Sequence, residues 1–116
     1  MSSLGMQGPY ELNSATISAV VTRTSPGNYA LGTKNDTGAF AVYYVGRSDT
    51  DVRGRLISWV GNTKRPLFKF SYSTSPKAAF EKECENYHDF KPSDNNQHPG
   101  RPTNTNWKCP KCVIFD

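Results

Sequence analysis

One segment near the C-terminal end constrains the fold most, because it cannot hold itself together by burying apolar side chains. Residues 91–106 contain three Pro and four Asn, and no apolar side chain apart from those prolines. An irregular segment of this length inside a compact domain needs a function or a tie to the rest of the chain. Candidate ties flank it, since Cys84 and His88 precede it and Cys109 and Cys112 follow it.

The spacing of these residues is typical of a metal site. Cys84 and His88 are four residues apart, which places them on one face of a helix. Cys109-Pro-Lys-Cys112 has the spacing of a metal-binding knuckle, and the four residues form a Cys₃His set that uses every cysteine. We therefore predict a structural Zn²⁺ held by Cys84, His88, Cys109 and Cys112. His98 is the alternative to His88, and reduced, unligated cysteines are the alternative to the site as a whole.

The length of 116 residues fits a single domain. We expect a lead-in with a first element at 1–24, the main domain at 25–90, and an irregular loop and knuckle packed on it at 91–116. The longest apolar run, 40–45, is too short to span a bilayer, and residues 1–8 show no basic segment followed by an apolar stretch. These features argue against a membrane protein, a secreted disulfide scaffold and a coiled coil. They predict an intracellular protein, in the cytoplasm or in the nucleoid or nucleus, without a membrane partner.

Positive charge is concentrated in one part of the chain. The net charge is +4, and the window from Arg47 to Lys69 alone holds six basic and two acidic residues. A basic window on an otherwise neutral chain predicts a surface that faces a polyanion such as DNA, whereas a solvated face is the alternative. The residues expected to contact nucleic acid are Arg47, Arg53, Trp59, Lys64, Arg65 and Lys69.

Hydrophobic patterning predicts an α+β fold. Short strands are expected at 28–31 and 39–45, joined by a hairpin loop, and an alternating third strand at 67–72. Helices are expected over 51–60 and over 76–89, where Ser75 is a good N-cap and Pro76 a good first residue. Residues 15–23 could be helix or strand, and their β-branched residues favour strand. The expected architecture is a small mixed or antiparallel three-stranded sheet flanked by helices, with a zinc-tied tail.

Four short motifs follow one another in an order that resembles the GIY-YIG nuclease superfamily. They are Gly27-Asn28-Tyr29, Tyr44-Val45-Gly46, Arg55-Leu56 and an acidic residue within Glu83–Tyr87. Each motif alone is weak, but four in this order and spacing are more specific. The resemblance covers roughly residues 25–90 and implies a small endonuclease that hydrolyses DNA phosphodiester bonds with a divalent metal.

The resemblance also implies roles for four catalytic residues. Tyr29 would activate water, and Tyr44 would support the water or the phosphate. Arg55 would hold the phosphate and help to lower the pKa of the phenols. Glu83 would hold one Mg²⁺ or Mn²⁺ ion, since its spacing to Tyr87 matches that of the family helix.

Trp59 departs from the family pattern, because members commonly carry His or Tyr at this position. An indole has an N–H donor and no acceptor, so Trp59 cannot act as a base. Its ring could instead stack on a nucleotide or extend the core. Two alternatives to the nuclease therefore remain, a nucleic-acid-binding module of the same fold without turnover and a zinc-tied protein-interaction domain.

Overall fold

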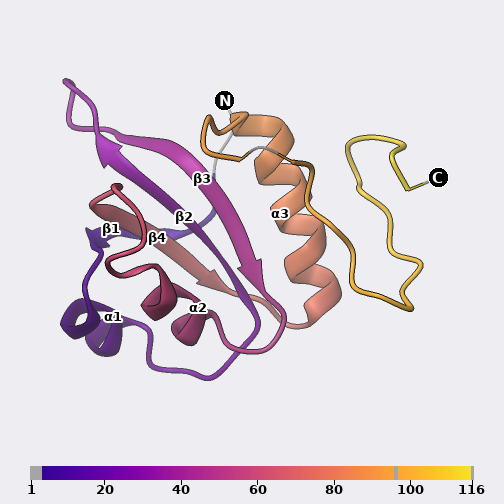
Figure 1. Cartoon of the computed structure of the whole chain (residues 1–116), viewed down its shortest axis with the longest axis horizontal. Helices are drawn as coiled ribbons and strands as arrows, with labels where there is room; N and C mark the ends of the chain where they lie inside the picture. Colours follow the sequence, from indigo (N-terminus) through magenta and orange to yellow (C-terminus); the bar gives the residue numbers. More distant parts are fainter. Residues whose placement is uncertain (1–3, 96, 116) are drawn as a thin grey trace.

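The computed structural model describes residues 4–95 and 97–115 (Figure 1). Four strands form one antiparallel sheet in the order β1-β4-β2-β3, and three helices complete the fold. The elements are β1 (Gln7–Glu11), α1 (Ser14–Val20), β2 (Gly27–Lys34), β3 (Phe40–Ser48), α2 (Val52–Trp59), β4 (Leu67–Tyr72) and α3 (Pro76–Phe90). The α+β class is thus confirmed, with four strands instead of three and no parallel pair among the described residues.

Two N-terminal elements differ from the prediction. Residues expected to be a loose lead-in form β1, which pairs with β4 at Tyr10 and Phe68. Pro9 obscured this strand, because a proline argues against a strand in the middle of a sheet. It is tolerated here because β1 is an edge strand. The strand favoured at 15–23 is wrong, since α1 lies there. The Asn13 side chain caps this helix by accepting a 2.8 Å hydrogen bond from the Thr16 backbone N–H.

The two faces of the sheet carry different helices (Figure 1). Helices α1 and α2 cover one face, where Ile17, Leu56 and Phe68 belong to the main core. Helix α3 covers the other face, where Tyr87 and Phe90 pack on Ala30 and Val45. Because side chains alternate along a strand, Tyr29 points toward α2 while its neighbour Ala30 points toward α3.

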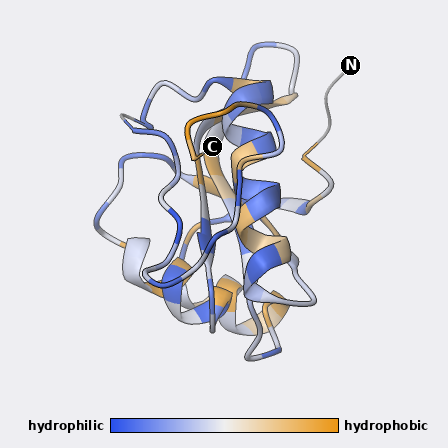
Figure 2. Ribbon diagram, turned by 90° about the vertical axis from the view of Figure 1, so that its right-hand side faces the viewer, coloured by the Kyte–Doolittle hydropathy of each residue, from blue (hydrophilic) through white to orange (hydrophobic). Residues whose placement is uncertain are grey.

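The segment that follows α3, which we call the tail (residues 91–95 and 97–115), has no helix or strand among its described residues. Its first part lies at the outer edge of β3, and its last part packs on α3. The Asn95 side chain mimics a neighbouring strand, because its Oδ1 accepts from Val45 N at 2.9 Å and its Nδ2 donates to Val45 O at 3.0 Å. The backbone N–H of Asp94 also donates to Tyr43 O at 2.8 Å. Most of the tail is hydrophilic, but Val113 and Ile114 form an exposed apolar stretch near its end (Figure 2).

No helix among the described residues is both long and apolar enough to cross a bilayer.

Candidate functional site

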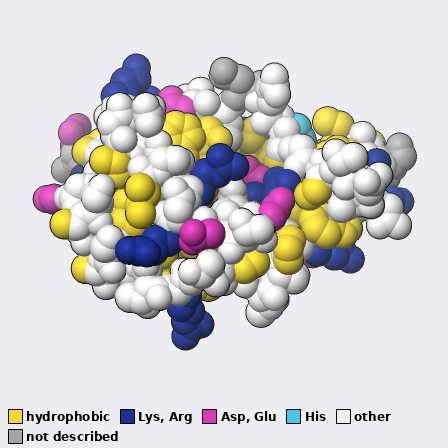
Figure 3. Space-filling view, turned by 60° about the horizontal axis from the view of Figure 1, so that its bottom comes forward, with side chains coloured by type: hydrophobic (Ala, Val, Ile, Leu, Met, Phe, Trp, Pro, Cys, Tyr) yellow, Lys and Arg dark blue, Asp and Glu magenta, His cyan; other side chains and the backbone are white. Residues whose placement is uncertain are grey.

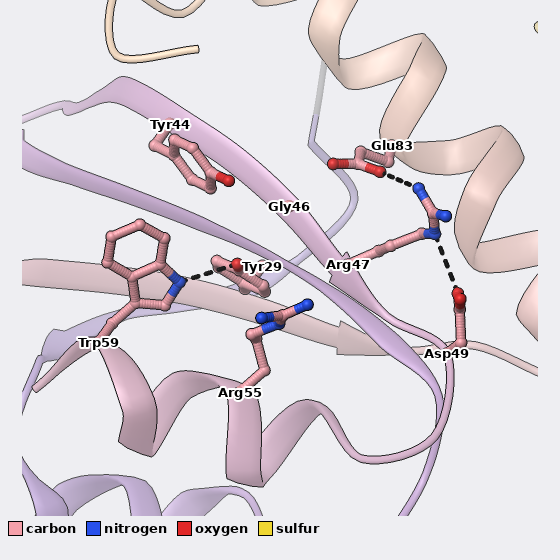
Figure 4. A pocket seen from close by; sticks show the side chains of 8 residues that line it. All are labelled: Tyr29, Tyr44, Gly46, Arg47, Asp49, Arg55, Trp59 and Glu83. Atoms are coloured by element: carbon pink, nitrogen blue, oxygen red, sulfur yellow. Dashed lines mark hydrogen bonds and ion pairs between the residues drawn. The ribbon is translucent and has the colours of Figure 1, made fainter. Parts of the chain in front are cut away.

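A pocket of about 230 Å³ opens where α2 and α3 meet the edge strand β3 (Figure 4). Strands β2 and β3 supply its tyrosines, α2 supplies an arginine and a tryptophan, and α3 supplies a carboxylate. All four residues that the resemblance implied as catalytic line it. The full lining is Tyr29, Tyr44, Gly46, Arg47, Asp49, Arg55, Trp59 and Glu83.

Sheet register brings the two tyrosines together. Tyr29 is paired with Gly46, and Leu31 with Tyr44, so the phenols lie on the same face of adjacent strands. Their ring centroids are 6.2 Å apart with an interplanar angle of 25°. Gly46 makes this arrangement possible, because a Cβ atom there would lie 2.5 Å from the Tyr29 hydroxyl oxygen. The glycine of the second motif is therefore a packing requirement of the first tyrosine.

Trp59 belongs to the wall of this pocket. Its indole Nε1 donates a 2.8 Å hydrogen bond to Tyr29 Oη, and its ring centroid lies 5.0 Å from that of Tyr44. Its N–H group is committed to Tyr29, and contact of its ring with nucleic acid stays a prediction.

Burial controls the protonation of the two phenols. Burial raises the pKa of Tyr29 well above its ordinary value, although the hydrogen bond from Trp59 works in the opposite direction. The pKa of Tyr44 is also raised, first by burial and then by the nearby charge of Glu83. Both tyrosines are therefore neutral at pH 7 in this state.

An ion-pair network occupies the side of the pocket next to α3. Arg47 Nη1 donates to Glu83 Oε1 at 2.5 Å and Arg47 Nε donates to Asp49 Oδ1 at 2.9 Å. The third nitrogen, Nη2, donates to Gly100 O of the tail at 2.7 Å, and the guanidinium lies 5.1 Å from the Phe80 ring centroid. Arg47 was expected to contact nucleic acid; the structure instead ties it to groups of its own chain.

The Arg47–Glu83 pair is largely removed from water, with side-chain exposures of 13% and 10%. Burial raises the pKa of the Glu83 carboxyl, and Arg47 opposes this only in part. Burial alone would lower the pKa of Arg47, but Glu83 and Asp49 together raise it.

Arg55 is the cation of the pocket that is free to bind a ligand. It projects from α2, which is anchored in the core through Val52 and Leu56. Its guanidinium points into the space beside Tyr29 and Tyr44 (Figure 4), and within the described part of the chain it forms no hydrogen bond. A planar guanidinium in this state is suited to a phosphate or carboxylate.

The remaining basic residues do not gather on one face. Arg65 pairs with both oxygens of Asp94 and lies 3.8 Å from the Tyr43 ring centroid. Lys69 stands over the Phe40 ring on the α3 side of the sheet, opposite α2. Arg53 donates to Ser18 Oγ at 3.1 Å, and Lys64 is exposed. Figure 3 accordingly shows Lys and Arg scattered among Asp and Glu around the side that carries α1 and α2.

A second site lies between the end of α3 and the tail. Four residues there have ligand atoms within 4.8 Å of one another and could hold a metal ion such as Zn²⁺. They are His88, His98, Cys109 and Cys112. The group differs from the predicted set in one member, because it contains His98 and does not contain Cys84.

Packing explains the difference. Cys84 is fully buried with Phe80 and Cys109 in a small core cluster, and burial raises the pKa of its thiol. The tail folds back on α3 and brings the His98 ring to 5.1 Å from the His88 ring. His88 and His98 therefore belong to the same group rather than being alternatives.

The polar atoms of this group are arranged as metal ligands would be. His88 Nε2 is buried and has no hydrogen-bond partner among the described residues. His98 Nδ1 lies 2.9 Å from the Pro99 carbonyl oxygen, so it carries the proton and leaves the lone pair of Nε2 toward Cys112 Sγ, 3.4 Å away. The Lys111 N–H donates to Cys109 Sγ at 3.4 Å. Burial also lowers the pKa of His88, which favours the neutral form that binds metals.

Sequence reasoning missed Asp49 in the pocket, and it treated His98 as an alternative to His88 rather than as a second histidine of the same metal group. Asp49 follows Arg47 by two residues, a spacing at which a carboxylate can reach the same guanidinium, and this was the available signal. Chemically, the pocket offers two phenols, two carboxylates and a guanidinium that has no partner among the described residues, a set suited to binding and attacking a phosphate ester. Comparison with protein-family models, with curated proteins and with solved structures finds no match to this chain.

Proposed function

We propose that this protein is a small endonuclease, similar to the GIY-YIG nucleases, that hydrolyses phosphodiester bonds of DNA. One observation carries the proposal: Tyr29, Tyr44, Arg55 and Glu83 come from four different elements and line one pocket. Four weak motifs have little reason to converge in space unless the pocket uses them together. Chemistry also favours a phosphate ester, because the free cation of the pocket faces two phenols.

Each residue has a role in this reaction. Arg55 binds the scissile phosphate and stabilises the charge that develops on it. Tyr29 takes the proton of the attacking water, and Tyr44 orients the water or the phosphate. For Tyr29 to accept a proton it must first lose its own, so a cation has to offset the effect of burial on its pKa.

Glu83 is the residue that would hold a divalent cation, Mg²⁺ or Mn²⁺. One of its carboxylate oxygens is bound to Arg47, whereas Oε2 forms no hydrogen bond among the described residues. A bound divalent ion supplies positive charge next to the phosphate and lowers the pKa of nearby groups. Asp49 is the other carboxylate in the pocket.

The second site supports a structural role for zinc. Two imidazoles and two thiolates complete a tetrahedral set with no protein ligand missing, as is typical of structural Zn²⁺. We propose that Zn²⁺ holds the tail against α3 and so fixes the helix that carries Glu83.

The decisive experiment is the nicking of supercoiled plasmid DNA in the presence of Mg²⁺ or Mn²⁺. We expect nicking by the wild-type chain and none by Glu83→Gln or Arg55→Ala. Glu85→Gln, an exposed residue on the same helix, is the matched control and should retain activity. Nicking that survives in Glu83→Gln, or no nicking by any variant, would refute the proposed reaction.

A nucleic-acid-binding module without turnover is the second candidate. The ion pair between Arg47 and Glu83 favours it, because the pair occupies a carboxylate that a metal-dependent nuclease needs. Salt-sensitive DNA binding by a wild-type chain that never nicks would select this candidate.

A further inference from the structure

We propose that Trp59 is a positioning residue for Tyr29, holding the phenol oxygen so that the Tyr29 proton faces the pocket. The inference rests on the proposed function of the same pocket. It also assigns to Trp59 a role other than contact with DNA.

Hydrogen-bond chemistry fixes the direction of the proton. The indole N–H is a donor without a matching acceptor, so the 2.8 Å bond from Trp59 Nε1 uses a lone pair of Tyr29 Oη. The Tyr29 proton cannot point at Trp59. The backbone of Gly46 lies against the tip of the phenol, and the remaining direction leads to the pocket and to Tyr44.

The fold holds the indole in place from several sides. Trp59 is the last residue of α2 and lies one turn after Arg55, so both side chains reach the same pocket. Its ring packs on Tyr44 at an interplanar angle of 58°. The Asn62 N–H donates to Trp59 O at 2.8 Å and fixes the main chain beyond the helix. A donor held this way keeps its direction while a ligand binds.

The bond from Trp59 favours the form of Tyr29 that accepts a proton. A hydrogen bond to a phenolate is stronger than one to a neutral phenol. In the proposed reaction Tyr29 first releases its own proton through the pocket to solvent. The phenolate oxygen then takes a proton from water, the resulting hydroxide forms a bond to phosphorus, and the bond to the leaving oxygen breaks. That oxygen then takes a proton from solvent. The groups that act on the charge of Tyr29 are Tyr44 from β3, Arg55 and Trp59 from α2, and Glu83 from α3.

The hydrogen bond itself can be tested without turnover. The chain has two tryptophans, so a ¹⁵N-labelled sample gives two indole N–H signals, and Trp107→Phe identifies which is which. We expect Tyr29→Phe to shift the Trp59 signal upfield and to speed its exchange with D₂O about tenfold, the factor for a loss of about 1.4 kcal/mol. The Trp107 signal should stay in place. An unchanged Trp59 signal in Tyr29→Phe would overturn the proposal.

The positioning role is tested by Trp59→Phe, which keeps a ring and removes the donor. A bond to a charged group contributes about 1.5–3 kcal/mol, so kcat for plasmid nicking should fall roughly 10- to 100-fold while KM changes less than about twofold. The rise of kcat with pH should move to higher pH, because the phenolate loses its donor. Trp107→Phe, whose ring packs on Phe80 and does not line the pocket, is the control.

The other outcomes are distinct. A rise in KM at unchanged kcat would mean that Trp59 stacks on DNA, and an unchanged pH profile would mean that it only supports packing; either result overturns the proposal. Absence of nicking by the wild-type chain, with the indole bond confirmed by NMR, would refute the proposed reaction and leave Trp59 without a positioning role in catalysis.

Discussion

The Glu83 carboxylate has little access to water, and Arg47 is its one cationic hydrogen-bond partner within residues 4–95 and 97–115. Burial raises its pKa in the folded state, so the folded chain binds a proton at Glu83 more readily than the unfolded chain does. For an acid with a raised folded pKa, this contribution to stability is present below the unfolded pKa and is lost as pH rises through the folded value.

We therefore expect Glu83→Gln to change how stability depends on pH. The wild-type free energy of unfolding should fall relative to that of Glu83→Gln as pH rises from about 4 to 7, across and above the ordinary pKa of a glutamate. Urea unfolding followed by tryptophan fluorescence at several pH values measures this difference. Glu85→Gln is the exposed control and should run parallel to wild type. A difference of the opposite sign would mean that Arg47 outweighs burial.

Gly46 is the residue on which the geometry of the tyrosines depends. A Cβ atom at this position would meet the Tyr29 ring and hydroxyl, so Gly46→Ala should displace Tyr29 and cost about 1–3 kcal/mol of stability through overpacking. Nicking should be lost with it. Gly100→Ala is the control, because its Cβ would meet open space. Full activity in Gly46→Ala would show that the position of Tyr29 does not matter.

At the residue scale, the tyrosines, Arg55 and Glu83 could be found from sequence because each sits in a short local motif. His98 and Asp49 could not be assigned to their sites from the sequence in the same way. His98 joins the metal group only because the tail folds back on α3, and Asp49 joins the pocket only because Arg47 turns toward α3. The sequence pattern alone predicts neither the return of the tail to α3 nor the direction of the Arg47 side chain.

Among the helices and strands, some are determined by local sequence and were predictable, and others depend on distant pairing and were not. Helix α3 was predictable because Ser75 caps it, accepting from Ala78 N at 3.1 Å, and its starting proline agrees with that cap. Strand β1 was not, because it exists through its pairing with β4 some 60 residues later, which the Gly8-Pro9 pair disguises. Helix α1 shows a cap prevailing over the β-branched residues within it.

Helix α1 gives a test at this scale. Asn13→Ala removes the side chain that accepts from Thr16 N, so the free energy of unfolding should fall by about 1 kcal/mol. Chemical denaturation measures it. Ser14→Ala, at the exposed neighbouring position, should stay within about 0.5 kcal/mol of wild type. Equal losses in the two variants would show that the Asn13 cap contributes nothing particular.

At the scale of the whole molecule, the proposed zinc site makes metal binding and folding of the tail one process. A chelator should lower the melting temperature and speed amide exchange in residues 97–115, while the β2–β3 hairpin stays protected, because its core does not involve the tail. Amide exchange read by mass spectrometry distinguishes the two regions. Equal amide exchange in the tail with and without chelator would show that a metal does not stabilise the folded tail.

Zinc content distinguishes the ligand group found in the structure from the set expected from the sequence. His98→Ala should lower the zinc content of the purified protein from about one equivalent, since one lost ligand opens the tetrahedron. Cys84→Ala is the matched control: it loses packing with Phe80 but should keep its zinc. Full zinc in His98→Ala together with loss in Cys84→Ala would restore the Cys₃His set.

The Asn95 amide has a consequence for how the protein behaves at high concentration. A sheet grows by adding strands at its edges, and an edge with free N–H and C=O groups invites another chain. Here the side chain of Asn95 occupies those groups at Val45, and Pro9 lies in the strand at the opposite edge. The tail thus blocks the addition of a further strand at the β3 edge of the sheet. In the proposed zinc site, loss of the metal would release the tail and leave the outer edge of β3 open to intermolecular pairing, even while β2 and β3 stay paired. The metal would then also protect the protein against aggregation.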